Sequence, residues 1–357
     1  MRNKKIIILI LAFLFFSRLI LTLFGFYACK TCEKKCSVSS FKSLSHIWLR
    51  WDSGWYKKIA KEWYPSKKIK KPYREEKYAF FPLYPLFVRF FHLFLRDWNW
   101  SLIFASNFFF FLALYFFYLM YGKEAPKFLI LWPTSFLLSG GFTESLFLFL
   151  AILSFYFLKK KNFLAAGLSG FLLGLTKPQG GFFFLVLILS YFSQKKFKIG
   201  KDFIFCFFPI LGTFHYFWYL FYLTGDFFAW FKVETAWAHK FTFPWDFYNE
   251  AHLKWPNLNF NLWFSLFLFF LFLFSFRFLS LNEKLYGILF LILPFFYNPF
   301  ITSLFRYEAI LFPAPLVFSR ISQKNKFLGD IFGVSFSLLQ GGLFYLWICQ
   351  IKYAFII

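Results

Sequence analysis

Residues 6–23 read IIILILAFLFFSRLILTL, and apolar runs of this kind recur from here to the C-terminus. A helix of about 20 apolar residues crosses the roughly 30 Å hydrocarbon core of a bilayer. Of the 357 residues, 60% are hydrophobic, a fraction that excludes an ordinary soluble protein. Basic residues precede this first run as in a signal peptide, but no small-residue cleavage site follows it, so we interpret it as a retained span. We therefore expect a single all-α polytopic membrane domain over residues 1–357.

The net charge of +24 comes from lysines that lie between the apolar runs. In such positions, basic residues orient the neighbouring spans and contact anionic lipid headgroups. The sequence shows no basic stripe of the kind that soluble nucleic-acid-binding proteins carry. We therefore expect membrane lipids as partners and exclude nucleic acid.

The basic clusters also predict a topology. If those near residues 2–5, 123–127, 159–161, 195–201, 277–284 and 320–326 all face the cytoplasm, the segments between them cross in pairs. The C-terminus then lies outside, and about 11 transmembrane helices result, at 6–27, 101–121, 126–140, 142–158, 163–176, 180–193, 203–223, 262–278, 285–299, 303–319 and 328–350. Two large extracytoplasmic loops follow, 28–100 and 224–261. In the first loop, Pro82 and Pro85 favour a re-entrant or interfacial helix within residues 80–95.

A short amphipathic helix is expected immediately after Asp52. In residues 53–64, SGWYKKIAKEWY, the apolar side chains fall on one helical face and the lysines on the other. Such a helix lies in the headgroup layer rather than crossing the membrane. Asp52 or Ser53 stands at its N-cap, where a side-chain oxygen accepts amide hydrogens of the first turn. Asp52 is therefore either a helix cap or a functional carboxylate, and the sequence leaves both open.

Ionisable residues at the ends of spans mark functional sites by default, because their burial in lipid is costly. Besides Asp52, three such residues lie on the predicted outer side: Glu144 after a Gly-Gly pair, Lys177 in a break between two short helices, and Arg306 near the end of a span. The topology places all four on one membrane face, which favours a single composite site.

Each of these residues also has a structural interpretation. Glu144 can cap its helix, Lys177 can extend to the headgroups, and Arg306 can pair with Glu308 or with a lipid phosphate. Arg18 lies within the first span and needs a buried partner that the sequence does not reveal.

The five cysteines allow more than one arrangement. Cys206 and Cys349 lie in apolar runs and are expected to be core residues. Cys29, Cys32 and Cys36 cluster after the first span, where they form one disulfide with a spare thiol, or a metal site with His46 as the fourth ligand. A disulfide is favoured if this loop faces an oxidising compartment.

An ordered series of motifs resembles the PIG-V family of membrane mannosyltransferases, which includes the enzyme that adds the second mannose of GPI-anchor precursors. The resemblance covers about residues 48–318. Its motifs are Arg50-Trp51-Asp52-Ser53-Gly54-Trp55-Tyr56, Ala79-Phe80-Phe81-Pro82-Leu83-Tyr84-Pro85-Leu86, Thr143-Glu144-Ser145-Leu146-Phe147, Thr176-Lys177-Pro178-Gln179-Gly180, Gly225-Asp226 with Ala236-Trp237, and Arg306-Tyr307 with Phe312-Pro313.

The resemblance implies a GT-C-type glycosyltransferase in the cell membrane, with catalysis on the extracytoplasmic face and a polyprenyl-phosphate-linked sugar donor. The Trp51-Asp52 pair corresponds to the functional signature of the family. Lys177 departs from the pattern, because relatives often have arginine there. The acceptor stays open and is a lipid, a glycan or a protein.

From these residues we predict an inverting transfer with Asp52 as general base, since a polyprenyl phosphate leaves without needing a proton. Lys177 and Arg306 are expected to bind the donor phosphate, and Glu144 to orient Asp52 or the sugar. Two alternative functions stay open. One is a transferase that uses another polyprenyl-linked sugar, such as arabinose or glucose, and the other is a lipid-linked-glycan flippase. We expect no resident cofactor, with a divalent cation left open. The predicted substrate-binding residues are Arg50, Trp51, Glu144, Lys177, Gln179, Arg306 and Tyr307.

Overall fold

A computed structural model of the chain describes residues 2–32, 41–71, 73–74, 76–237, 239, 241, 259–275, 277–296 and 304–349, and it is all-helical, with no strand in these ranges. The α-helices are α1 (Arg2–Thr31), α2 (Ser45–Trp48), α3 (Ser53–Glu62), α4 (Leu83–Leu95), α5 (Trp98–Tyr121), α6 (Glu124–Leu131), α7 (Glu144–Lys159), α8 (Phe163–Gly174), α9 (Phe184–Lys195), α10 (Phe208–Thr224), α11 (Ala229–Glu234), α13 (Asn259–Phe274), α14 (Leu281–Ile292), α15 (Leu304–Ala309), α16 (Pro313–Lys324) and α17 (Lys326–Cys349). Short 3-10 helices are η1 (Phe41–Leu44), η2 (Lys77–Ala79), η3 (Ser135–Ser139), η4 (Pro178–Phe183), η5 (Lys201–Phe207), η6 (Thr235–Trp237) and η8 (Leu293–Phe296).

Four helical stretches of the described residues are long and apolar enough to cross a membrane: Lys4–Thr31, Trp98–Tyr121, Lys201–Thr224 and Lys326–Cys349. Shorter apolar helices cover Leu83–Leu95, Phe163–Gly174 and Trp263–Phe274. These lengths and compositions indicate a membrane protein. Each of the predicted spans contains a helix, although several are interrupted, as α6 is separated from η3 by a turn at 132–134. The number of crossings stays a prediction.

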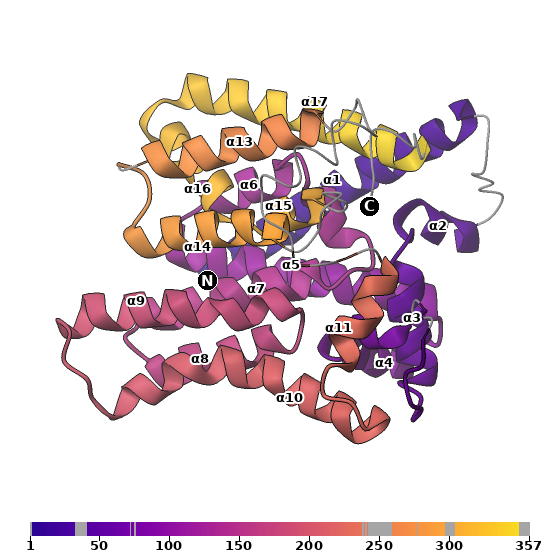
Figure 1. Cartoon of the computed structure of the whole chain (residues 1–357). Coiled ribbons are helices and arrows are strands. Elements are labelled where there is room, and N and C mark those ends of the chain that lie inside the picture. Colours follow the sequence, from indigo (N-terminus) through magenta and orange to yellow (C-terminus); the bar gives the residue numbers. More distant parts are fainter. Residues whose placement is uncertain are drawn as a thin grey trace.

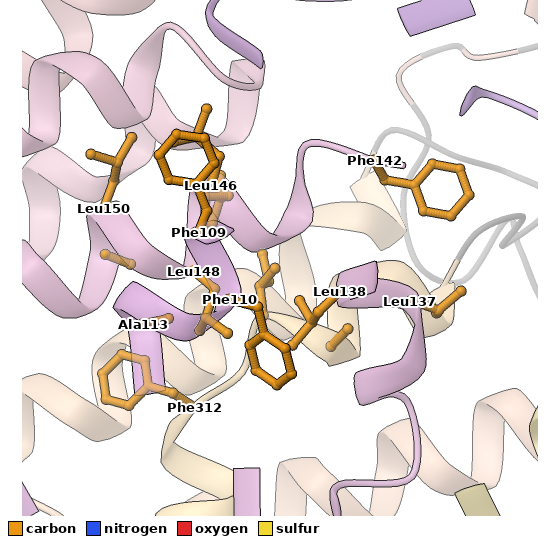
Figure 2. Packing of buried hydrophobic residues seen from close by; sticks show 14 of the residues in the cluster. Phe109, Phe110, Ala113, Leu137, Leu138, Phe142, Leu146, Leu148, Leu150 and Phe312 are labelled. Carbon is orange, nitrogen blue, oxygen red and sulfur yellow. The ribbon is translucent and has the colours of Figure 1, made fainter. Parts of the chain in front are cut away.

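The long helices pack side by side into one bundle (Figure 1). α5 contacts α4, α6 and α7, α8 lies between α7 and α10, and α17 packs against α1 and α16. Aromatic and branched side chains fill the space between these helices. Figure 2 shows part of this core, where Phe109 and Phe110 of α5 lie near Leu146 and Leu148 of α7, and Phe312 at the start of α16 lies near Ala113 of α5.

The segment after α1 contains a helix at each of the two places where one was predicted, α3 and α4. In α3, Tyr56, Ile59 and Ala60 are buried while Lys58 and Lys61 are exposed, which confirms the expected faces. α4 begins after Pro82 and packs against α3 and α5. Figure 1 shows α2, α3, α4 and α11 together at the right-hand end of the bundle.

The basic clusters gather at the opposite end. Lys159 of α7 donates to the carbonyl of Met120 at 3.3 Å, and Lys127 of α6 pairs with Asp330 of α17 at 3.5 Å. Gln194 of α9 donates to the carbonyl of Leu158. These contacts join the ends of helices that the topology had placed on one side of the membrane.

Arg18 finds its partner outside its own helix. Its guanidinium donates to the carbonyl of Ser135 at 3.1 Å and to the Ser135 hydroxyl at 3.3 Å, and it lies over the ring of Phe110. Gln340 of α17 also donates to the Ser135 hydroxyl, at 2.7 Å. The first residue of η3, within the predicted span 126–140, thus supplies two acceptors for one nitrogen of the buried guanidinium.

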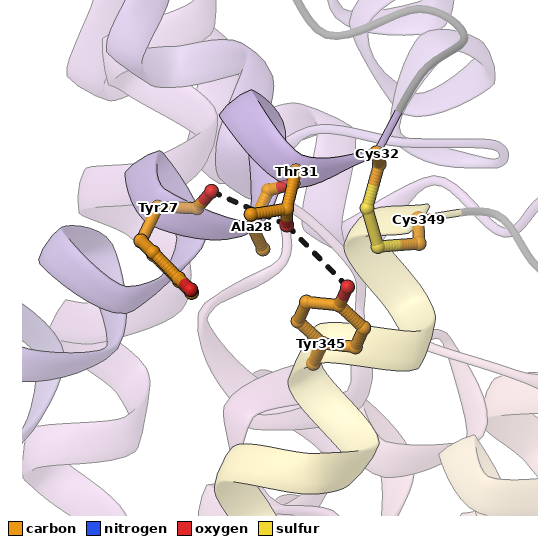
Figure 3. Close-up of a disulfide and its surroundings, with 6 residues drawn as sticks. All are labelled: Tyr27, Ala28, Thr31, Cys32, Tyr345 and Cys349. Atoms are coloured by element: carbon orange, nitrogen blue, oxygen red, sulfur yellow. Dashed lines mark hydrogen bonds between the residues drawn. A yellow bond between two sulfur atoms is a disulfide. The ribbon is translucent and has the colours of Figure 1, made fainter.

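The expected cysteine arrangement is wrong in two respects: Cys32 is bonded outside the cluster of Cys29, Cys32 and Cys36, and Cys349 takes part in a disulfide. Cys32 forms a disulfide with Cys349, with the two Cα atoms 5.4 Å apart, so Cys349 is not merely a core residue (Figure 3). Cys206 is buried and free, as expected, and Cys36 lies outside the described residues. No group of three or more His, Cys, Asp or Glu residues in the described ranges could hold a metal ion.

Candidate active site

Asp52 stands at the N-cap position of α3, but its side chain does not cap the helix. Instead, the carboxylate accepts a hydrogen bond from Nη1 of Arg306, which is 254 positions further along the chain. The preceding residue, Trp51, has a φ of 45°, a conformation that non-glycine residues seldom adopt. Its ring packs on that of Trp347 in α17 with the centroids 5.6 Å apart. The capping interpretation of Asp52 is therefore wrong, and its carboxylate is turned toward distant helices.

Glu144 is the first residue of α7 and is completely buried. Its Oε1 accepts from Nε of Arg306 at 2.6 Å and from Nζ of Lys177 at 2.6 Å. The helix begins after Gly141, whose φ of +75° favours glycine, and a Cβ at that position would collide with the Leu49 side chain near α3. Glu144 makes no capping bond, so this second capping interpretation is wrong as well.

Lys177 lies in the break between α8 and η4, as predicted. The break is tight, because a Cβ on Gly180 would collide with the backbone carbonyl of Leu173. Lys177 does not extend to the headgroups. Its ammonium group bonds Glu144 and lies 5.0 Å from the centre of the Tyr307 ring.

Arg306 in α15 joins the two carboxylates and lies over the ring of Phe142 at 4.5 Å. Of the structural alternatives for Arg306, the pair with Glu308 is wrong, because the Glu308 carboxylate accepts instead from the hydroxyl of Ser265 at 2.7 Å. Successive residues of a helix point in different directions, so positions 306 and 308 face different neighbours.

We call Asp52, Glu144, Lys177 and Arg306 the charged network. Two carboxylates and two cations balance in formal charge, which offsets part of the large penalty for burying them. The side chain of Asp52 is 23% exposed, against 6% for Arg306 and 0% for Glu144. Asp52 is therefore the carboxylate of the network that an incoming molecule can reach.

The charged network borders a pocket of about 100 Å³. Of the predicted site residues, Asp52, Lys177, Gln179, Arg306 and Tyr307 line it, and Gln179 donates to the Tyr307 hydroxyl at 3.3 Å. Glu144 stands behind the two cations. Arg50 and Trp51 do not line the pocket; the guanidinium of Arg50 lies over the Trp347 ring at 5.5 Å, beside Trp51.

Several lining residues were not predicted from the sequence. Tyr56 of α3 and Phe80 contribute from the first loop, and burial together with the nearby Glu144 charge raises the pKa of the Tyr56 phenol well above its ordinary value. Glu234 and His239, from the segment that follows α10, bond each other at 2.6 Å. The sequence indicated a special position for this segment through its aromatic richness and through the Gly225-Asp226 and Ala236-Trp237 motif, but it pointed to neither Glu234 nor His239.

Chemically, the pocket presents two cations, a reachable carboxylate and aromatic walls. Such a set fits an anionic ligand with an attached polar group, and the carboxylate can accept a proton from it or from a second molecule. No protein-family model matches the chain, and no curated protein does.

Proposed function

We propose that the protein is a membrane glycosyltransferase of GT-C type that moves a mannosyl residue from a polyprenyl-phosphate donor to an extracytoplasmic lipid, glycan or protein acceptor. The observation that carries this proposal is the pairing of Asp52 with Arg306 at the edge of a pocket that Lys177 also lines. A phosphate-bearing ligand needs the two cations, and an acceptor hydroxyl needs the carboxylate. The motif series that resembles the PIG-V family supports the same assignment.

In this proposal the donor phosphate binds Arg306 and Lys177. Because the phosphate competes with Asp52 for the Arg306 guanidinium, donor binding releases the carboxylate from its pair. Glu144 retains both cations through its bonds of 2.6 Å to Arg306 and Lys177 while this exchange occurs. The site is thereby kept neutral in the absence of substrate and becomes reactive only when the donor is bound.

The transfer then needs one base. The acceptor hydroxyl attacks the anomeric carbon while Asp52 accepts its proton. The bond between that carbon and the phosphate oxygen breaks, and the electron pair leaves with the polyprenyl phosphate, which Arg306 and Lys177 stabilise. One displacement inverts the anomeric centre, whereas retention would need a second carboxylate acting as nucleophile.

An extracytoplasmic position of the pocket is supported by the Cys32–Cys349 disulfide. Trp347, two positions before Cys349, packs on Trp51, the neighbour of Asp52, so the disulfide and the pocket lie at the same end of the bundle. Disulfides persist in oxidising compartments and are rare in the cytosol. The lysine clusters at the opposite end agree with this orientation.

The test is a donor screen with the purified protein in nanodiscs. Labelled polyprenyl-phosphate mannose, glucose and arabinose are supplied separately with a membrane lipid extract as acceptor, and we expect transfer from the mannose donor. Replacing Asp52 by Asn should lower this transfer by about 100-fold or more, because removal of a positioned base costs about 10²–10⁴ in rate.

Asp202→Asn is the matched control, because Asp202 pairs with Lys195 at 3.7 Å in an exposed position at the other end of the bundle. It should transfer like the wild type. Transfer by Asp52→Asn within a few-fold of the wild type would remove Asp52 as base, and a wild type inactive with every donor would refute the proposed function.

A further inference from the structure

A second group of polar side chains lines the same pocket, from the segment that comprises α11, η6 and His239. Glu234 ends α11 and is buried, and its Oε2 lies 2.6 Å from Nδ1 of His239. The backbone N–H of His239 also donates to the Glu234 carbonyl at 3.1 Å. These two bonds hold His239 against the end of α11, with Nδ1 of its imidazole facing the Glu234 carboxylate.

Trp237, between these two residues, provides an unused hydrogen-bond donor. Its indole Nε1 is buried and has no hydrogen-bond partner among the described residues, and the side chain lines the pocket. A buried N–H without a partner is destabilising, and few such groups occur in native proteins. Its position at a pocket points to a ligand that supplies the missing acceptor.

Aromatic rings surround this donor. Trp237 packs edge-on against Trp55 at 5.7 Å and against Phe80 at 5.8 Å between ring centroids. Trp55 and Phe80 stack on each other at 5.9 Å with an interplanar angle of 15°. A sugar ring has C–H faces that pack on aromatic rings and an edge of hydroxyls that donate and accept. The combination of these rings with the Trp237 donor and the Glu234–His239 pair matches such a ligand.

We propose that Trp237, Glu234 and His239 form a subsite for the hexosyl ring of the donor. Trp237 donates its indole N–H to an oxygen of the sugar, and the Glu234–His239 pair bonds sugar hydroxyls. The proposal rests on the proposed function, which places the donor phosphate at Lys177 and Arg306 in the same pocket. It adds that the choice among polyprenyl-linked sugars is made by Glu234, Trp237 and His239.

The test compares the affinities of two probes for the protein in nanodiscs: polyprenyl phosphate, and polyprenyl phosphate that carries mannose. Trp237→Phe keeps an aromatic ring but removes the N–H. We expect it to weaken binding of the mannose probe by about 10-fold, the effect of one lost hydrogen bond, and to leave binding of the bare phosphate unchanged. His239→Asn should act in the same direction and serves as the second variant if Trp237→Phe does not fold.

Trp63→Phe is the matched control, because the Trp63 indole N–H already donates to the hydroxyl of Tyr219 at 2.7 Å and Trp63 lies outside the pocket lining. It should bind both probes like the wild type, whereas Lys177→Ala should weaken both. A Trp237→Phe variant that binds the mannose probe as the wild type does, or that loses affinity for both probes equally, would overturn the sugar subsite. If the wild type transfers no sugar while Trp237→Phe weakens binding of the mannose probe alone, the proposed function fails and the subsite stands.

Discussion

Two buried glutamates at opposite ends of the bundle show how similar burial serves different purposes. Glu283 lies in the first turn of α14 at the basic end, where it forms a capping box with Ser280, accepts from the Tyr121 hydroxyl at 2.5 Å, and lies 3.7 Å from Arg320. Glu144 begins α7 at the pocket end and caps nothing. Its bonded partners are two cations, Arg306 and Lys177, from other parts of the chain. The carboxylate of Glu283 closes a helix end, whereas that of Glu144 holds two charges beside a cavity.

The arginines at the two ends of the bundle differ in how exposed they are. Arg320 at the basic end is 31% exposed, so that water and salt screen its interactions, whereas Arg306 is 6% exposed. A buried cation depends on its bonded carboxylates, because the bilayer offers no water in their place. The charged network should therefore respond strongly to single substitutions and the basic end weakly. Two comparisons test this difference, and a third experiment tests which end of the bundle faces outward.

The largest effect is expected from the two glutamates themselves. Glu144→Gln leaves Arg306 and Lys177 without their shared charge, and breaking a buried ion pair costs about 3–5 kcal/mol. In Glu283→Gln, the amide oxygen still accepts from Tyr121 or from the Ser280 backbone, so a loss of about 1 kcal/mol is expected. Thermal unfolding of both variants in one detergent measures the difference. Equal losses would mean that the charged network is no more sensitive than an ordinary helix end.

The affinity of the protein for the sugar donor should depend on the lysine at the pocket end and not on the lysine at the basic end. Lys177→Ala is expected to raise the KM for the polyprenyl-phosphate donor by about 10–100-fold, since hydrogen bonds to charged groups contribute about 1.5–3 kcal/mol. Lys177→Arg keeps the charge and should recover part of the affinity. Lys159→Ala removes a lysine that lies over the Tyr121 ring at the basic end and should leave the KM unchanged. An unaltered KM in Lys177→Ala would exclude this side chain from phosphate binding.

The sequence allowed much of the helical framework to be predicted, because apolar runs between lysine clusters are a local signal. The amphipathic face of α3 and the helix break at Lys177 were visible for the same reason. The predicted topology placed the four residues of the charged network on one membrane face. It could not show that their side chains are in contact. That Asp52 bonds Arg306, and that Arg306 does not bond Glu308, depends on how distant helices pack.

Other parts of the site gave little local signal, since Ala236-Trp237 was the only motif among them. Glu234, Trp237 and His239 follow α10 in a segment whose composition suits an aromatic belt at the membrane interface. Their arrangement depends on contacts such as that between the Trp230 indole and the Ala79 carbonyl, at 3.2 Å. Cys349 resembled a core residue because it lies in an apolar run. Its bond to Cys32 requires α1 and α17 to be neighbours, and nothing in either helix predicts that.

The smallest effect is expected from Cys32→Ser, which removes the disulfide at the pocket end. α1 and α17 also pack through Phe24 and Tyr345, whose ring centroids are 6.1 Å apart, so the helices stay together without the covalent link. A loss of a few degrees in apparent unfolding temperature is expected, below the usual range for disulfides, because the membrane already restricts the unfolded chain.

Cys349 becomes a thiol in this variant, and a membrane-impermeant maleimide added to intact cells should modify it, as peptide mapping would show. Cys206, which is buried, serves as the internal control and should stay unmodified. Labelling of Cys349 only after cell lysis would place the pocket end in the cytoplasm and reverse the orientation of the two ends.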